Sequence, residues 1–307
     1  GNPLFGILKM RSDEPKDSYP NIERAKKMLN WKPKISIEKG LNKTINYYKK
    51  QKKMSIRTAV ILCGGKGTRL GELGKKTAKT LVKVQGKQIL WYILKILKKN
   101  KFNHFILPVG FKGQNIVEFI KNSSEFQKYN IDIINTGPNS SIAKRIFKIK
   151  KYIQSDNFLI LNGDAIFDAN LDEILNNHIK KKKDLSFICC EAQAQFGTIE
   201  VMNNKIINFQ RGIDFKSVNT NEINYKAYVY SGMSIINRKI LNENFKNYEN
   251  FEKDFYPKVI KKYKSDIHSL QGFWYAMDNI KDYDVLNKKN INNKIFNKIY
   301  KLHKKLK

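Results

Sequence analysis

The chain has few cysteines and few histidines, and neither type is spaced for a metal centre. Only three of its 307 residues are cysteines, and two of these, Cys189 and Cys190, are adjacent. This pattern provides neither a disulfide framework nor a C-x-x-C metal pair. None of the four histidines has a metal-binding partner four residues along the chain. The remaining interpretation of the cysteines, small apolar residues in strands, fits a reducing cytoplasm.

Long apolar runs are also missing. No uninterrupted apolar run in the chain approaches the ~20 residues that cross a bilayer. The first residues have neither the basic start nor the long apolar core that are typical of a signal peptide. We therefore expect a cytoplasmic protein without a transmembrane segment.

Acidic residues are scarce relative to basic ones, 27 against 59, which gives a formal net charge of +32. The lysines are spread along the whole chain, with clusters only at Lys180–Lys183 and near the C-terminal end. A dedicated nucleic-acid surface would concentrate them in one patch. We expect no specific nucleic-acid partner, and a positive field that attracts anionic substrates.

The most informative stretch follows a short apolar run, Thr58–Leu62, which has the length of a buried strand. Glycines, a threonine and an arginine come directly after it: Gly64, Gly65, Gly67, Thr68 and Arg69. Closely spaced glycines let the backbone approach a ligand and turn its N–H groups toward it. Because Arg69 and Lys79 would add positive charge, this stretch predicts a cradle for a nucleoside triphosphate.

Two familiar phosphate loops are excluded. The Walker pattern ends in Gly-Lys-Ser/Thr, but Lys66 is followed by Gly67. The dinucleotide fingerprint G-x-G-x-x-G needs a glycine where Leu70 stands.

The pattern GGxGTRL after a strand resembles the sugar-1-phosphate nucleotidyltransferases, most closely the glucose-1-phosphate cytidylyltransferases. The resemblance extends over residues 58–286. It implies an enzyme that joins a nucleoside triphosphate, with CTP favoured, to a sugar 1-phosphate, releasing pyrophosphate, for surface polysaccharide biosynthesis. The stretch NGDAIFD also resembles guanylyltransferases for mannose or heptose phosphates, so a GDP- or UDP-sugar product is an alternative. Some of the family's sequence elements are altered in this chain, so a second alternative is a sugar-nucleotide-binding protein without catalytic activity.

The fold expected from Met54 onward is α/β, because strand and helix patterns alternate there. We predict a Rossmann-like, mostly parallel mixed sheet flanked by helices over residues 54–286. After Asp184 the pattern indicates a small antiparallel part that the resemblance assigns to sugar binding. Residues 287–307 carry apolar side chains at helical spacing with lysines between, and predict a basic amphipathic helix suited to forming a homo-oligomer.

Residues 1–53 have a different character. Two helical stretches separated by a proline resemble the C-terminal end of extended short-chain dehydrogenases, the NAD-dependent sugar epimerases. Neither the glycine fingerprint nor the Tyr-x-x-x-Lys pair of that family is present, so no such activity is expected. We interpret this stretch as an appended helical segment that is dispensable for the rest.

Two distant acidic residues are candidates for one metal site. Asp164 follows the apolar run Phe158–Leu161, and the carboxyl end of a strand is the usual ligand crevice of an open α/β sheet. Asp278 ends the stretch GFWYAMD, which is similar to the GFWxxMD signature of the cytidylyltransferases. The resemblance implies that both carboxylates hold Mg²⁺, together with phosphate oxygens and water.

The resemblance also implies roles for the remaining positions. The catalytic set is Arg69, Lys79 and Asp164. Nucleotide binding is expected from the strand end and the glycine turns, at Leu62, Gly64, Gly65, Gly67, Thr68, Arg69, Gly110 and Gly163. Binding of the sugar phosphate is expected at Lys79, Arg145, Gly197, Arg211 and Gly232.

Overall fold

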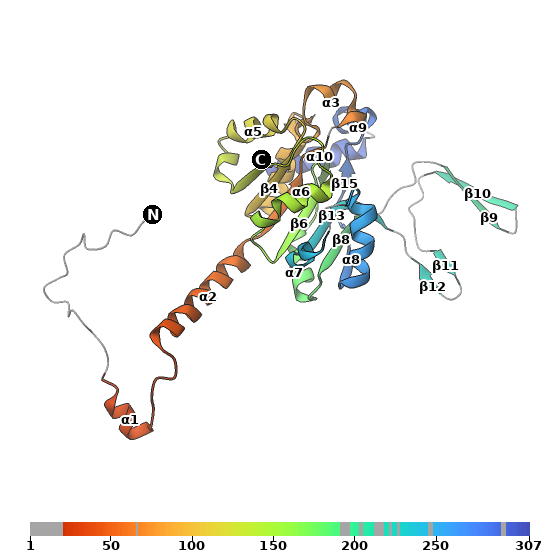
Figure 1. The fold of residues 1–307 in the computed structure, drawn as a ribbon. Coiled ribbons are helices and arrows are strands. Elements are labelled where there is room, and N and C mark those ends of the chain that lie inside the picture. Colours follow the sequence, from red (N-terminus) through yellow and green to blue (C-terminus); the bar gives the residue numbers. More distant parts are fainter. Residues whose placement is uncertain are drawn as a thin grey trace. The chain divides into compact units, whose positions relative to one another are not determined.

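The computed structural model in Figure 1 describes residues 21–65, 67–190, 197–202, 205–211, 218–220, 223–225, 228–244, 248–289 and 293–307. The chain divides into two units, residues 1–51 and 52–307. No helix within the described residues is both long enough and apolar enough to cross a membrane.

The first unit contains two helices, α1 (Glu23–Leu29) and the start of α2 (Ile37–Ser55). Both helices agree with the predicted helical stretches. Apolar residues on α2 recur at every fourth position, and Ile37, Leu41 and Ile45 are 82%, 57% and 46% exposed. No described residue of this unit is buried, so its helices do not form a core of their own.

The second unit is built on a seven-stranded sheet with the order β14-β8-β13-β6-β1-β4-β5. At its centre, β1 (Thr58–Leu62) pairs in parallel with β4 (His104–Val109) and β6 (Asn157–Asn162), and β4 pairs in parallel with β5 (Ile131–Asn135). β13 (Val229–Asn237) runs antiparallel between β6 and β8 (Leu185–Cys190), and β14 (Ser265–Ser269) is parallel to β8. The predicted mostly parallel mixed sheet is confirmed.

Helices cover both faces of this sheet (Figure 1). They are α4 (Ile89–Lys99), α5 (Gly113–Lys121), α6 (Ile142–Ile149), α7 (Leu171–Lys180), α8 (Tyr256–Lys262), α9 (Ile280–Asn287) and α10 (Lys294–Leu306). Alternate side chains of a strand point to opposite faces. Accordingly, Ala59 and Ile61 join one hydrophobic core with α4 and α10, whereas Val60 joins a second core with α6 and α8.

Short elements complete the unit. A helix α3 (Glu72–Lys76) and the pair β2 (Lys83–Val84) and β3 (Lys87–Gln88) follow the glycine turn. The strands β9 (Gly197–Met202) and β10 (Lys205–Arg211), and β11 (Val218–Thr220) and β12 (Ile223–Tyr225), form two antiparallel hairpins. Antiparallel pairing was predicted here, and the sugar-binding role of this part stays a prediction.

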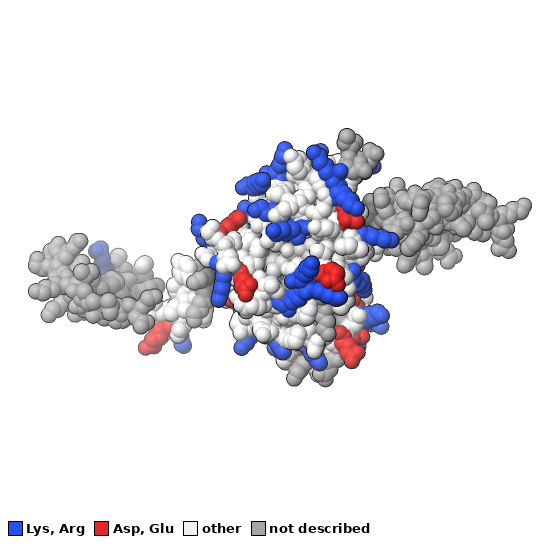
Figure 2. Space-filling view, turned by 90° about the horizontal axis from the view of Figure 1, so that it is seen from above, with Lys and Arg blue, Asp and Glu red and all other residues white. Residues whose placement is uncertain are grey.

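The C-terminal helix is helical as predicted, but it is part of the core. Ile299, Leu302 and Leu306 of α10 are at most 6% exposed and belong to the same cluster as α4. Three of the apolar side chains on which the expectation of a homo-oligomer rested are therefore covered inside this chain. Over the face drawn in Figure 2, lysines and arginines lie scattered among neutral residues.

A buried histidine ties α7 to the sheet. His178 is fully buried, and its Nδ1 lies 2.8 Å from Ser186 Oγ while its Nε2 lies 3.1 Å from Asn157 Oδ1. Because an amide oxygen only accepts, Nε2 carries the proton and Nδ1 accepts from the serine hydroxyl. Burial lowers the pKa of His178 from its usual 6.5 to about 4.

We predict that the free energy of unfolding decreases as the pH falls from 6.5 toward 4. In this range the unfolded chain takes up a proton on His178 and the folded chain does not. The contribution of neutral His178 to the free energy of unfolding is therefore complete above pH 6.5, and up to about 3 kcal/mol of it is lost by pH 4. Urea unfolding at pH 7 and pH 5 measures the change. An equal loss of stability in the variant His178→Gln would contradict this assignment.

Candidate active site

The turn after β1 contains three glycines, Gly64, Gly65 and Gly67, and leads into a short 3₁₀ helix, Thr68–Leu70. Cys63, the first residue of the turn, is buried, and burial raises the pKa of its thiol to about 12. This thiol is protonated at neutral pH and is no nucleophile. Arg69 projects from the 3₁₀ helix with 75% of its side chain exposed.

The two predicted metal carboxylates are brought together by a pair of short strands. Asp164 precedes β7 (Ala165–Phe167), and Asp278 lies just after β15 (Trp274–Ala276). These strands pair antiparallel with Ala165 opposite Ala276, and the N–H of Met277 donates to the carbonyl of Asp164 at 2.9 Å. The pairing of β7 with β15 therefore places Asp164 and Asp278, which are far apart in the sequence, at the same end of this two-stranded sheet.

Asp278 also stands at the start of a helix. Its backbone N–H donates to Asp282 Oδ2 at 2.7 Å, and the next residue, Asn279, forms a capping box with Asp282 at the N-terminus of α9. A carboxylate before a helix N-terminus is stabilised by the helix dipole. Asp282 thus fixes the backbone that carries Asp278.

Lys79 lies between the two carboxylates. Its Nζ donates to Asp164 Oδ2 at 2.7 Å and to Asp278 Oδ1 at 3.0 Å. Burial alone would lower the pKa of Lys79, but the charges and hydrogen bonds of the two aspartates outweigh it and raise the pKa above the usual 10.5. Arg69 Nη1 adds a longer contact of 3.3 Å to Asp278 Oδ2. Four of the six predicted charged residues, Arg69, Lys79, Asp164 and Asp278, therefore meet at one place.

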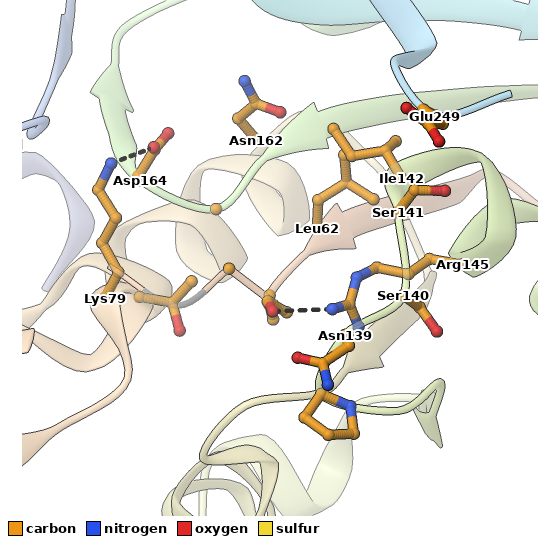
Figure 3. A pocket seen from close by; sticks show the side chains of 16 residues that line it. Leu62, Lys79, Asn139, Ser140, Ser141, Ile142, Arg145, Asn162, Asp164 and Glu249 are labelled. Carbon is orange, nitrogen blue, oxygen red and sulfur yellow. Dashed lines mark hydrogen bonds and ion pairs between the residues drawn. The ribbon is translucent and has the colours of Figure 1, made fainter. Parts of the chain in front are cut away.

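A cavity of about 760 Å³ extends from this cluster (Figure 3). Its size lies in the usual range for a small-molecule site. The lining comes from the end of β1, the residues after β6, and the segment before α6: Leu62, Cys63, Gly64, Gly65, Lys79, Thr80, Pro138, Asn139, Ser140, Ser141, Ile142, Arg145, Asn162, Gly163, Asp164 and Glu249. Cys63, Thr80, Asn162, the segment 138–142 and Glu249 are additions to the predicted set, and no motif in the sequence indicated Glu249.

Arg145 lines the cavity, but its guanidinium is used inside the protein. The residue is 4% exposed. Its Nη1 donates to the carbonyl of Val109 at 3.2 Å and to Thr136 Oγ1, and its Nη2 donates to the carbonyl of Gly64 at 2.9 Å. Burial lowers the pKa of Arg145. The predicted substrate-binding arginine therefore holds the ends of β1, β4 and β5 together in this structure.

Two of the predicted nucleotide-binding glycines have a packing role. A Cβ at Gly64 would lie 2.2 Å from Arg145 Cζ, so only glycine leaves room for the buried guanidinium. A Cβ at Gly163 would lie 2.7 Å from the carbonyl oxygen of Leu62, which accepts the N–H of Gly163 at 3.1 Å. Gly64 thus leaves room for a buried side chain, and Gly163 lets the ends of β1 and β6 approach closely at the cavity wall.

The remaining predicted positions lie elsewhere. Gly67, Thr68 and Gly110 are outside the described cavity lining, as is Gly232, which lies in an irregular part of β13. Gly197 and Arg211 pair with each other in the β9–β10 hairpin and do not line the described cavity either.

The sequence over residues 58–292 matches the model of a family described as nucleotidyl transferase. The chain belongs to this family. The sequence-based prediction of a nucleotidyltransferase enzyme is thereby confirmed, and the matched residues include both aspartates and Lys79.

Individual relatives of this nucleotidyl transferase agree with the family. The chain is 29% identical over 250 residues to the probable glucose-1-phosphate cytidylyltransferase of Bacillus subtilis (strain 168). This alignment covers 75% of this chain and 94% of the relative. It is 23% identical to the glucose-1-phosphate cytidylyltransferase of Salmonella typhimurium over 73% of this chain and 92% of the relative. The crystal structure of HddC from Yersinia pseudotuberculosis complexed with GMP-PN has the same fold, with a TM-score of 0.56, 20% identity, and coverage of 75% and 97% of the two chains.

Proposed function

We propose that this nucleotidyl transferase joins CTP to a sugar 1-phosphate, giving a CDP-sugar and pyrophosphate for surface polysaccharide biosynthesis. The observation that carries the proposal is the cluster of Lys79, Asp164, Asp278 and Arg69. Lys79 and Asp164 of this cluster line one end of the cavity. CTP is favoured because the two cytidylyltransferase relatives are similar to this chain along nearly their whole length.

The arrangement suits a displacement at phosphorus. An oxygen of the sugar 1-phosphate, already ionised near neutral pH, attacks the α-phosphorus. The bond to the β-phosphate oxygen breaks, and pyrophosphate leaves with the electron pair. Such a reaction needs positioning and positive charge, and it needs no covalent intermediate. Lys79 supplies a fixed ammonium, and the exposed Arg69 has room to turn toward a triphosphate.

The two carboxylates fit a magnesium ion. Mg²⁺ at phosphate-transfer sites takes one or two protein carboxylates and completes its shell with phosphate oxygens and water. Asp164 and Asp278 form such a pair, and they already share one cation, the Lys79 ammonium. Within the described ranges, three or more Asp, Glu, His or Cys side chains nowhere gather as a larger metal site. When bound by the two aspartates, the ion would neutralise charge on the triphosphate.

A substrate panel tests the proposal. Pyrophosphate release is measured with CTP, GTP, UTP and dTTP, each against several sugar 1-phosphates, with and without Mg²⁺. We expect the largest kcat/KM with CTP and loss of turnover when EDTA removes the metal. A preference for GTP or UTP would overturn the choice of base and retain the reaction. A folded protein that turns over no pair would support the non-catalytic alternative.

A further inference from the structure

The two ends of the cavity differ in chemistry. In Figure 3, Lys79 and Asp164 lie at one end, and Asn139, Ser140, Ser141 and Glu249 lie toward the other. If the proposed function holds, the triphosphate belongs beside the cations, because its charge needs them. The base of the same nucleotide then extends toward the end formed by residues 138–142 and Glu249.

Most polar groups at the base end already have partners. Ser140 Oγ donates to the carbonyl of Thr136, and Ser141 Oγ donates to the carbonyl of Tyr248 at 3.2 Å while accepting the N–H of Lys144. Arg145 Nη1 and Nη2 donate to Val109, Thr136 and Gly64.

Asn139 and Glu249 are the two polar residues at this end of the cavity that are left to consider. Among the residues whose side chains are described, neither forms a hydrogen bond or an ion pair, and both line the cavity. The Glu249 carboxylate is therefore a hydrogen-bond acceptor at the base end, and no described residue donates a hydrogen bond to it.

We propose that Glu249 selects nucleotides whose base carries an exocyclic amino group; this inference rests on the proposed function. A carboxylate only accepts hydrogen bonds. Cytosine presents an N4 amino donor, whereas thymine, like uracil, presents an O4 acceptor at the same position. A carboxylate facing that edge binds the amino group and repels the oxo group, so it discriminates by attraction and by repulsion together.

CTP and UTP form the matched pair for the test, because they differ only in the groups on this edge of one pyrimidine. We expect kcat/KM to favour CTP over UTP by about tenfold or more, the size of discrimination typical of one well-placed contact. In Glu249→Gln the amide can donate to O4 as well as accept from N4. The CTP/UTP ratio should therefore fall by about tenfold, which corresponds to the loss of that contact.

A neighbouring acid provides the control. Glu252 is exposed and does not belong to the described lining of the cavity, so Glu252→Gln should leave the CTP/UTP ratio unchanged. An unchanged ratio in Glu249→Gln, or an equal loss with both nucleotides, would overturn the role of Glu249. If GTP is the substrate, GTP and ITP replace the pair, because ITP lacks the guanine amino group.

Calorimetric binding keeps this inference separate from the proposed reaction. CTP and UTP are titrated into the wild-type protein and into Glu249→Gln. A preference for CTP in binding that the substitution removes supports the inference even if no nucleotide is turned over. Binding of both nucleotides with equal affinity, or of neither, would overturn it.

Discussion

Replacing Asp164 by Asn is expected to lower kcat by about three orders of magnitude while the protein stays folded. The substitution keeps the size of the side chain but removes the charge that faces Lys79 at 2.7 Å and, in our proposal, a ligand of Mg²⁺. Lys79 retains Asp278 as a partner, so the ammonium is not left alone. The free energy of unfolding should therefore change by no more than about 1 kcal/mol. Pyrophosphate release and urea unfolding measure the two effects.

The matched control is Asp168→Asn. Asp168 stands just after β7, and its nearest ion-pair partner is Lys305 of α10 at 3.6 Å. This substitution should leave kcat within about twofold, because a half-exposed surface pair contributes little. If Asp164→Asn kept wild-type turnover and the same dependence on magnesium concentration, Asp164 would not belong to the metal site.

The sequence identified both aspartates but could not indicate how they meet. Each was found from its own local pattern, Asn-Gly-Asp after a strand and GFWYAMD near the C-terminal end. The contact depends on the pairing of β7 with β15, and three-residue strands carry almost no periodic signal. The positioning role of Asp282 could not be predicted either, because its hydrogen bond to the N–H of Asp278 depends on where α9 begins.

Strand order was predictable in part. The parallel strands β1, β4, β5 and β6 are short apolar runs followed by helices, a pattern that indicates crossover connections and a buried sheet. The insertion of the antiparallel β13 between β6 and β8 is a non-local choice, because residues 163–228 lie between β6 and β13. The spacing within α10 predicted a helix, but the same apolar face serves an oligomer or a core equally well. Its burial against α4 was decided by tertiary packing.

Arg145 shows most clearly what a motif cannot reveal. A basic residue at this position resembles a substrate-binding arginine, and the sequence does not show whether its guanidinium reaches a ligand or the backbone. In the structure it is 4% exposed, and two of its three acceptors are main-chain carbonyls at the ends of different strands. Gly64 and Gly110 leave the space that this side chain fills, because a Cβ on either would come within 2.5 Å of it.

Replacing Arg145 by Met is accordingly expected to lower stability as well as activity. The carbonyl of Gly64 and the hydroxyl oxygen of Thr136 each lose a buried donor, at a cost of about 3 kcal/mol in total. The carbonyl of Val109 keeps the N–H and the hydroxyl of Thr136 as donors. For a unit of this size, Tm should fall by roughly 6–12 °C. Activity should fall with it, because the turn that begins at Gly64 loses its anchor. Thermal unfolding and pyrophosphate release are measured on the same preparations.

The neighbouring Lys144→Met provides the control for Arg145, since Lys144 is exposed and its side chain has no described polar partner. It should leave Tm within about 1 °C, as expected for a surface change. A directly substrate-binding Arg145 predicts the opposite pattern for Arg145→Met, with an unchanged Tm and a raised KM for one substrate alone. Arg145→Lys separates the two interpretations further. A lysine keeps the charge but cannot reach three acceptors at once through a planar fork, so it should restore substrate affinity only if charge is what the position provides.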